Sequence, residues 1–236
     1  MGLHLLVEDS QLGVAYGEYV LRKLFKLQAI DMVFDIGANS GQYGFCLRKQ
    51  IGYRGALRSY EPIPELAGGL RSATKADGNW TICQCALDEF GGEVDLNVMV
   101  GDQFSSLLRP REPYRGRFFG QNAVKNVIKV DAVTLATAVA EAPAFSNGLL
   151  KLDTQGTELA IMRGGVEVLP RFVAIQMELG FHALYEGAGT FVSALDALDS
   201  WGYRLCALFP NNEGHFPHLI ETDALFMRKD AIPDLK

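Results

Sequence analysis

The most informative stretch of the sequence is Val33-Phe34-Asp35-Ile36-Gly37-Ala38-Asn39-Ser40-Gly41-Gln42-Tyr43-Gly44. It follows Met32, so the apolar run 32–36 ends in a glycine-rich turn. A short, continuous apolar run of this kind suits a strand that is buried on both faces, as in parallel sheets. The residues after the turn predict a helix over 41–51. This strand, turn and helix are the arrangement in which open α/β sheets bind cofactors.

The same alternation of strands and helices continues along the chain. It predicts a doubly wound, mostly parallel sheet of seven strands, because each parallel connection needs a crossover helix. The further strands are expected at 57–60, 80–87, 149–153, 172–179, 204–209 and 224–227. The further helices are expected at 64–76, 134–141, 157–169 and 191–201.

Length and composition favour a single globular domain. The chain has 236 residues, of which 48% are apolar and 21% are charged, which excludes a disordered or fibrous protein. We expect one domain over 1–236, with a helical preface at 1–30 and an insertion at 92–130 that contains a β-hairpin and a lid loop. The net charge of -6 argues against a nucleic-acid partner held by phosphate contacts.

The sequence also predicts a cytoplasmic location. No apolar run approaches the roughly 18 residues that a membrane span requires, and acidic residues follow the first apolar residues, unlike a signal peptide. Cys83 and Cys85 are one residue apart, which matches neither a zinc knuckle nor a redox pair. We therefore expect reduced cysteines.

The glycine spacing distinguishes between two adenosine cofactors. A dinucleotide site needs Gly-x-Gly-x-x-Gly, so that the pyrophosphate can approach the middle glycine. Here Asn39 takes that place, and Asp35 brings a carboxylate that suits a positive sulfonium and ammonium. Glu61 ends the next strand, where a carboxylate can accept both ribose hydroxyls of either cofactor. The stretch favours S-adenosylmethionine, with an NAD-dependent oxidoreductase as the alternative.

At this point the sequence resembles the FkbM family of S-adenosylmethionine-dependent methyltransferases. The resemblance implies a Rossmann-like class I methyltransferase fold and O-methylation of hydroxyls on sugars or polyketide-like products. One departure is Ala136, which follows Thr134-Leu135 where the family often has an aspartate that we interpret as structural. Five stretches carry the resemblance, namely 33–43, Tyr60-Glu61-Pro62, Ser105-Ser106-Leu107, 150–158 (Leu-Lys-Leu-Asp-Thr-Gln-Gly-Thr-Glu) with Gly164-Gly165, and Glu178 with Leu184-Tyr185.

The resemblance also assigns cofactor contacts by position. Glu61 takes the ribose, and Ala86 and Leu87, just past the third strand, line the adenine. The methionine end of the cofactor is assigned to Asp35, Gly37, Asn39 and Gly41.

Two carboxylates are the main candidates for acceptor chemistry. Asp153 closes the fourth strand and Glu178 lies near the end of the fifth, at the sheet edge where the cofactor is expected. They could share a proton or hold a metal, although the sequence assigns no metal ligand. Asp153 could instead cap the next helix. His182 is the histidine best placed to act as a base.

Two long loops remain open to interpretation. The loop 109–117 carries Arg109, Arg111, Arg115 and Arg117, which could grip an anionic group or form a solvated face. His215 and His218 belong to the loop 210–221 and are expected to be lid or solvated residues.

Taken together, the motifs predict an S-adenosylmethionine-dependent O-methyltransferase that acts on a saccharide-containing or natural-product acceptor. The alternatives are the oxidoreductase and a non-catalytic adenosyl-binding module.

Overall fold

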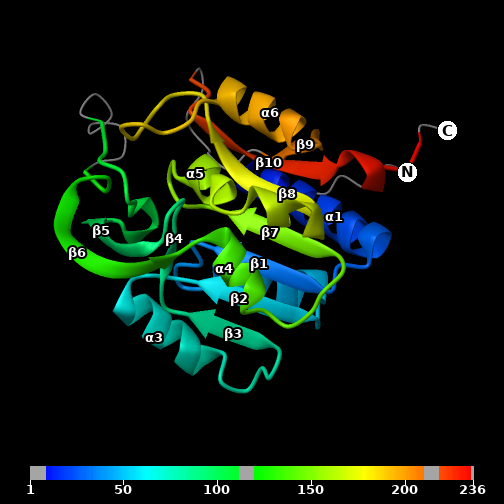
Figure 1. Cartoon of the computed structure of the whole chain (residues 1–236), viewed down its shortest axis with the longest axis horizontal. Helices are drawn as coiled ribbons and strands as arrows, with labels where there is room; N and C mark the ends of the chain where they lie inside the picture. Colours follow the sequence, from blue (N-terminus) through cyan, green and yellow to red (C-terminus); the bar gives the residue numbers. More distant parts are fainter. Residues whose placement is uncertain (1–8, 112–119, 210–217, 235–236) are drawn as a thin grey trace.

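The computed structural model describes residues 9–111, 120–209 and 218–234, and these residues form a doubly wound α/β fold around one large sheet (Figure 1). In spatial order its strands are β3 Trp80–Cys83, β2 Ala56–Tyr60, β1 Met32–Ile36, β7 Gly148–Leu152, β8 Phe172–Gly180, β10 Glu221–Arg228 and β9 Tyr203–Phe209. Neighbours from β3 to β8 are parallel, whereas β10 is antiparallel to both β8 and β9. The expected seven-stranded, mostly parallel sheet is confirmed.

A second, three-stranded sheet lies beside the main one and consists of β4 Ala86–Leu87, β6 Val124–Val133 and β5 Gly92–Met99, in the order β4-β6-β5. The residues 92–130 therefore supply an antiparallel β5–β6 pair. The expected single strand over 80–87 is wrong, because the chain leaves the main sheet after Cys83. Ala86 and Leu87 pair instead with Ala132 and Val133 of the second sheet.

The helices lie between the strands, close to where the apolar periodicity places them. The expected helix over 157–169 is interrupted at Gly164-Gly165, where an added Cβ would lie 2.8 Å from backbone atoms of Asp88 or Ala136. Glycine is needed there because two segments approach at backbone distance. The helices are α1 Asp9–Gln28, α2 Gln42–Cys46, η1 Leu47–Ile51, α3 Pro64–Ala73, η2 Asp102–Phe104, α4 Leu135–Ala140, α5 Glu158–Arg163, η4 Val166–Arg171, α6 Phe191–Ser200 and η5 Lys229–Ala231.

Helices cover both faces of the main sheet, which explains why β1 is apolar throughout. Side chains alternate between the two faces of a strand. Met32, Phe34 and Ile36 pack in the core under α4, α5 and α6, whereas Val33 packs in a second core with α1 and η1. Asp35 faces the same side as Val33 and is completely buried.

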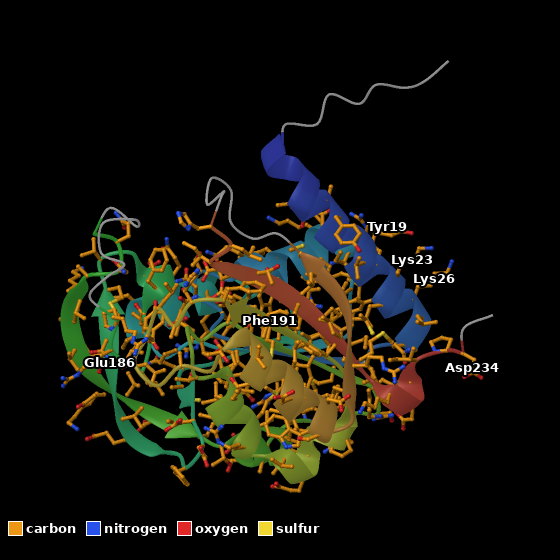
Figure 2. The ribbon with its side chains drawn as sticks, turned by 90° about the horizontal axis from the view of Figure 1, so that it is seen from above. Tyr19, Lys23, Lys26, Glu186, Phe191 and Asp234 are labelled. Atoms are coloured by element: carbon orange, nitrogen blue, oxygen red, sulfur yellow. The ribbon has the colours of Figure 1, made fainter. Side chains whose placement is uncertain are left out.

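Helix α1 runs along the outside of the molecule. Figure 2 shows Tyr19, Lys23 and Lys26 along α1, and all three are exposed to solvent. Its inner side buries Leu21 and Leu24 in the second core. Among the helices that the structure describes, none is both long enough and apolar enough to cross a membrane.

Candidate cofactor and acceptor site

A cavity of about 660 Å³ lies at the carboxyl ends of the parallel strands. This is the edge at which open α/β sheets bind their ligands. Its lining comes from the ends of β1, β2, β7 and β8, from β4 and β10, and from the segment 102–107 of the insertion. Of the ten predicted site residues, seven line this cavity, namely Gly37, Asn39, Glu61, Ala86, Leu87, Asp153 and Glu178.

The order of the strands in the sheet determines how far apart the cavity residues lie along the sheet edge. Glu61 follows β2, Gly37 follows β1, Asp153 follows β7, and Glu178 lies near the end of β8. Neighbouring strands are about 4.8 Å apart, so Glu61 and Glu178 are separated by three spacings, or about 14 Å. The cavity is long enough for a nucleoside and an acceptor to lie side by side across the sheet edge.

The turn after β1 is built by residues with left-handed backbone conformations. Gly37, Asn39 and Gly41 have φ angles of 78°, 49° and 88°. A Cβ on Gly37 would lie 2.0 Å from the carbonyl oxygen of Asp153, and one on Gly41 would lie 2.4 Å from Leu70. Gly37 therefore allows the turn to contact the loop after β7, whereas Gly41 does not line the cavity and allows close packing on α3.

Glu61 is a buried carboxylate that closes this turn. One of its oxygens accepts a hydrogen bond from the Asn39 N–H at 2.8 Å, and the other accepts one from the Ile63 N–H at 2.8 Å. Only 4% of its surface is exposed, and burial raises its pKa to about 7 against the opposing effect of these two N–H groups. Each carboxylate oxygen has two acceptor positions. Both oxygens therefore retain capacity for a hydroxyl group from the cavity.

The wall of the cavity beside Glu61 is apolar. Ala86 and Leu87 are buried in β4, and Ile63 and Leu96 line the same region. An aromatic base is stabilised by contact with such side chains through burial of its faces. The neighbouring carboxylate and apolar wall form a pair of features that suits a nucleoside.

A row of polar residues lies beneath the cavity on the α1 side of the sheet. Asp35 is paired in register with Ser59 of β2 and Lys151 of β7. The Ser59 hydroxyl donates to Asp35 at 2.9 Å, and the Lys151 ammonium lies 3.6 Å from the other carboxylate oxygen. Asp35 does not line the cavity. The structure thus differs from the expectation that this carboxylate points into the site.

Lys151 connects this row to the acceptor side. Its ammonium donates to Asp153 at 3.1 Å and lies 5.5 Å from the centre of the Tyr43 ring. The Tyr43 hydroxyl donates in turn to Gln176 at 2.9 Å. Burial opposes the charge on Lys151, but the nearby carboxylates Asp153 and Asp35 raise its pKa above the ordinary lysine value. Lys151 is therefore a fixed positive charge.

Asp153 and Glu178 are brought together by a residue that the sequence did not single out. The side-chain amide of Gln155 donates to Asp153 at 3.3 Å and to Glu178 at 2.9 Å. Asp153 keeps 42% of its side-chain surface exposed, and Glu178 is half-buried. The expected convergence of the two carboxylates at this edge is thus seen, with an amide between them.

Glu178 belongs to a cluster of acidic side chains. Asp223 of β10 is its cross-strand partner, and Glu221 lines the same cavity. Burial, together with the charges of Glu221 and Asp153, raises the pKa of Glu178 well above its ordinary value. Burial likewise raises the pKa of Asp223 to about 7. Among residues 9–111, 120–209 and 218–234, no three His, Cys, Asp or Glu side chains are grouped to hold a metal ion.

The remaining candidates lie away from the main cavity or outside the described residues. His182 lines a separate, smaller hollow that Glu178 and Gln155 also line. His218 is exposed and lines neither hollow, and His215 lies outside the described residues. Arg109 and Arg111 are exposed and do not line the main cavity. Arg115 and Arg117 also lie outside the described residues.

Several residues of the main cavity and of the smaller hollow were missed by sequence reasoning. Gln155 lines the main cavity and Tyr185 lines the smaller hollow. Both belong to stretches that carry the family resemblance, so their position in a motif was the available signal. Asp102, Gln176 and Asp223 had no such signal, because each reaches the cavity only through strand pairing or through the path of the insertion.

The charge of the cavity distinguishes between the cofactors considered from the sequence. Lys151 is its one lining cation within the part of the chain that the structure describes, and Asp35 and Asp153 already pair with it. Such a lining repels a pyrophosphate and attracts a sulfonium with an ammonium group. The acidic lining residues are Glu61, Asp102, Asp153, Glu178, Glu221 and Asp223.

The fold and this cavity define a class I methyltransferase that uses S-adenosylmethionine. The FkbM methyltransferase domain matches residues 35–205 of the chain. The chain therefore belongs to the FkbM methyltransferase family, which confirms the resemblance and makes it an enzyme. Of the alternatives from the sequence, the oxidoreductase and the non-catalytic module do not agree with this membership.

Two known methyltransferases are similar to this chain, one in sequence and one in fold. The 2-O-methyltransferase NoeI of Sinorhizobium fredii is 27% identical over 190 residues, which cover 76% of this chain and 74% of NoeI. An rRNA methylase structure from Streptococcus thermophilus aligns with a TM-score of 0.50 at 9% identity, over 95% of this chain and 99% of that one. The second likeness concerns the fold alone.

Proposed function

We propose that this enzyme transfers the methyl group of S-adenosylmethionine to a hydroxyl of a saccharide-containing or natural-product acceptor. The observation that carries the proposal is Asp153, a partly exposed carboxylate held at the cavity by Lys151 and Gln155. A hydroxyl is a weak nucleophile and gains about 10²–10⁴ in rate from a positioned base. The similarity to a 2-O-methyltransferase supports transfer to oxygen.

The cofactor roles follow the geometry of the cavity. Glu61 accepts the two ribose hydroxyls, and Ala86 and Leu87 contact the adenine. Gly37 and Asn39 form the turn beside the methionine end. Asp35 and Gly41 do not line the cavity, and we assign them supporting roles. Asp35 holds Lys151 in place, and Gly41 holds the turn against α3.

In the transfer itself, the residues of this chain position the acceptor and take its proton. The bound cofactor supplies a sulfonium methyl group as the electrophile. Asp153 accepts the proton of the hydroxyl as the new oxygen–carbon bond forms and the sulfur–carbon bond breaks. Lys151 keeps Asp153 oriented, and Glu178 with its raised pKa offers a proton donor to a second acceptor group. His182 is exposed and shares the smaller hollow with Glu178, and we assign it the exchange of protons between Glu178 and the solvent.

The acceptor side also bears on the class of substrate. Glu178, Glu221 and Asp223 are acidic and line the end of the cavity at β8 and β10. Carboxylates accept hydrogen bonds from hydroxyl groups and repel phosphates. A neutral, hydroxyl-rich small molecule or glycan fits this end better than a nucleic acid.

The experiment that tests the proposal uses the full chain with S-adenosylmethionine that carries a ¹³C-labelled methyl group. The acceptors are a panel of methyl glycosides, short oligosaccharides and hydroxylated polyketide-like compounds. We expect a methyl ether, seen as a mass increase and as a labelled O-methyl signal by NMR. A label found only on amine or thiol acceptors would refute O-methylation and leave the methyltransferase class intact.

A further inference from the structure

The amide of Gln155 lies between the two carboxylates at the acceptor side of the cavity. Its Nε2 donates to one oxygen of Asp153 at 3.3 Å and to one oxygen of Glu178 at 2.9 Å. An amide nitrogen has two N–H donors, so both can be used at once. Gln155 is 8% exposed and lines both the main cavity and the smaller hollow behind it.

The backbone of Gln155 adopts a conformation that is uncommon for its residue type. Its φ angle is 57°, in the left-handed region that residues other than glycine and asparagine rarely adopt. The hydroxyl of Ser106 donates to its carbonyl oxygen at 2.9 Å, which fixes this conformation from the insertion. Strain of this kind persists where surrounding contacts determine it, and it clusters at functional sites.

Tyr185 contributes to the orientation of the Gln155 amide. The single proton of the Tyr185 hydroxyl is shared between two acceptors, the carbonyl oxygen of Phe104 at 2.8 Å and Gln155 Oε1 at 3.0 Å. An amide has its acceptor on one side and its donors on the other. The shared donor at Oε1 and the two carboxylate acceptors at Nε2 together keep Nε2 toward Asp153 and Glu178. Tyr185 is 4% exposed, so solvent does not compete for this contact.

We propose that Gln155 is a positioning residue for methyl transfer, which holds the Asp153 and Glu178 carboxylates at a fixed separation and is itself oriented by Tyr185. The proposal rests on the proposed function, because it takes Asp153 as the base. A hydrogen-bond donor to a carboxylate favours its ionised form. Loss of Gln155 therefore removes one of the two hydrogen bonds that hold Asp153, the other being from Lys151. It also makes ionisation of Glu178 less favourable.

The surroundings of Glu178 make this effect measurable. It faces Asp223 and Glu221 on β10, Asp153 after β7, Glu158 on α5 and Tyr185. His182 also lines the smaller hollow with Glu178. The four carboxylate neighbours disfavour the ionised form, whereas the Gln155 amide is a neutral donor that favours it. Removing this donor should move the titration of Glu178 to higher pH.

The test uses the full chain with Gln155→Met, which keeps a similar length and removes both donors, and Tyr185→Phe, which frees the amide. Gln50→Met is the matched control, since Gln50 is exposed and lines neither the main cavity nor the smaller hollow. Glutamate labelled with ¹³C at the side-chain carboxyl reports the titration of Glu178, and a Glu178→Gln variant assigns its signal. The kcat and the KM for S-adenosylmethionine are measured over pH 5–9 on whichever glycoside the wild-type enzyme methylates.

For Gln155→Met we expect the Glu178 titration to rise by about half a pH unit or more. We expect kcat to fall at least about tenfold, while the KM for the cofactor changes less than about twofold. Tyr185→Phe should change the Glu178 titration and kcat in the same direction by a smaller amount. Gln50→Met should change neither the titration nor kcat. An unmoved titration and pH profile, with only a lower melting temperature, would overturn the proposal. The titration needs no acceptor, so it remains decisive even where no methyl transfer is found.

Discussion

Replacing Glu61 by glutamine should weaken cofactor binding without unfolding the protein. The glutamine keeps the shape of the side chain and one acceptor oxygen, so the Ile63 N–H can still be bonded. It removes the charged acceptor for the ribose hydroxyls. A hydrogen bond to a charged group contributes about 1.5–3 kcal/mol, which corresponds to a Kd for S-adenosylmethionine about 10- to 150-fold higher.

The stability of this variant should change little, because two effects oppose each other. Burial raises the pKa of Glu61 from 4.5 to about 7, so its ionised form destabilises the folded state by about 3 kcal/mol at pH 8. This penalty is absent below pH 4.5 and grows as the pH rises toward 7. Glutamine removes the penalty but leaves the Asn39 N–H facing an amide, which costs about 1–3 kcal/mol.

The assay is isothermal titration of S-adenosylmethionine into the full chain from pH 6 to pH 8. With a pKa of about 7, the ionised fraction of Glu61 rises about tenfold over this range. The wild-type Kd should fall accordingly, and Glu61→Gln should remove this pH dependence. Glu65→Gln, an exposed acid in the first turn of α3, is the control. Unchanged affinity in Glu61→Gln, with a folded protein, would refute the ribose assignment.

Three further substitutions test other parts of the site. Asp153→Asn should lower kcat by about 10²-fold or more and leave the Kd for the cofactor within about twofold; equal turnover, measured by transfer of labelled methyl, would remove Asp153 as the base. Gly37→Ala should lower the melting temperature sharply, because its Cβ would lie 2.0 Å from the Asp153 carbonyl oxygen at a φ of 78°; a wild-type thermal transition would contradict this contact. Lys151→Met should cost about 3–5 kcal/mol at neutral pH, since it leaves Asp35 buried without its positive partner. Burial raises the pKa of Asp35, and the loss of Lys151 raises it further, so this deficit in urea denaturation should shrink as the pH falls and Asp35 is protonated. A deficit that is the same at pH 4 and pH 8 would show that the pair does not contribute in this way.

The position of β1, the start of α3 and the carboxylate at the end of β2 could be predicted from the sequence. The apolar run 32–36 predicts β1 because a strand covered by helices on both faces has no polar side. Pro64 predicts the start of α3, since its missing N–H has no partner in the first turn. Glu61 at the end of β2 predicts a carboxylate at the cavity, because the carboxyl ends of parallel strands meet at one edge.

Other features depended on contacts between segments that are distant in the sequence. The run 80–87 looks like one strand, but Ala86 and Leu87 find partners only when β6 folds back beside them. Asp35 has the local sequence of a cofactor ligand, yet its alternation with Phe34 and Ile36 places it on the face where Lys151 and Ser59 bury it.

The sequence by itself therefore determined the fold class, the cofactor and the approximate edge of the sheet at which the site lies, because these follow from local periodicity and from motifs within single segments. Only the tertiary structure decided which carboxylates face the cavity and what holds them. Gln155 meets Glu178 across 23 positions and Tyr185 across 30 positions of the chain. A side chain's partners at such separations are set by strand register and packing, which no single segment of the sequence encodes.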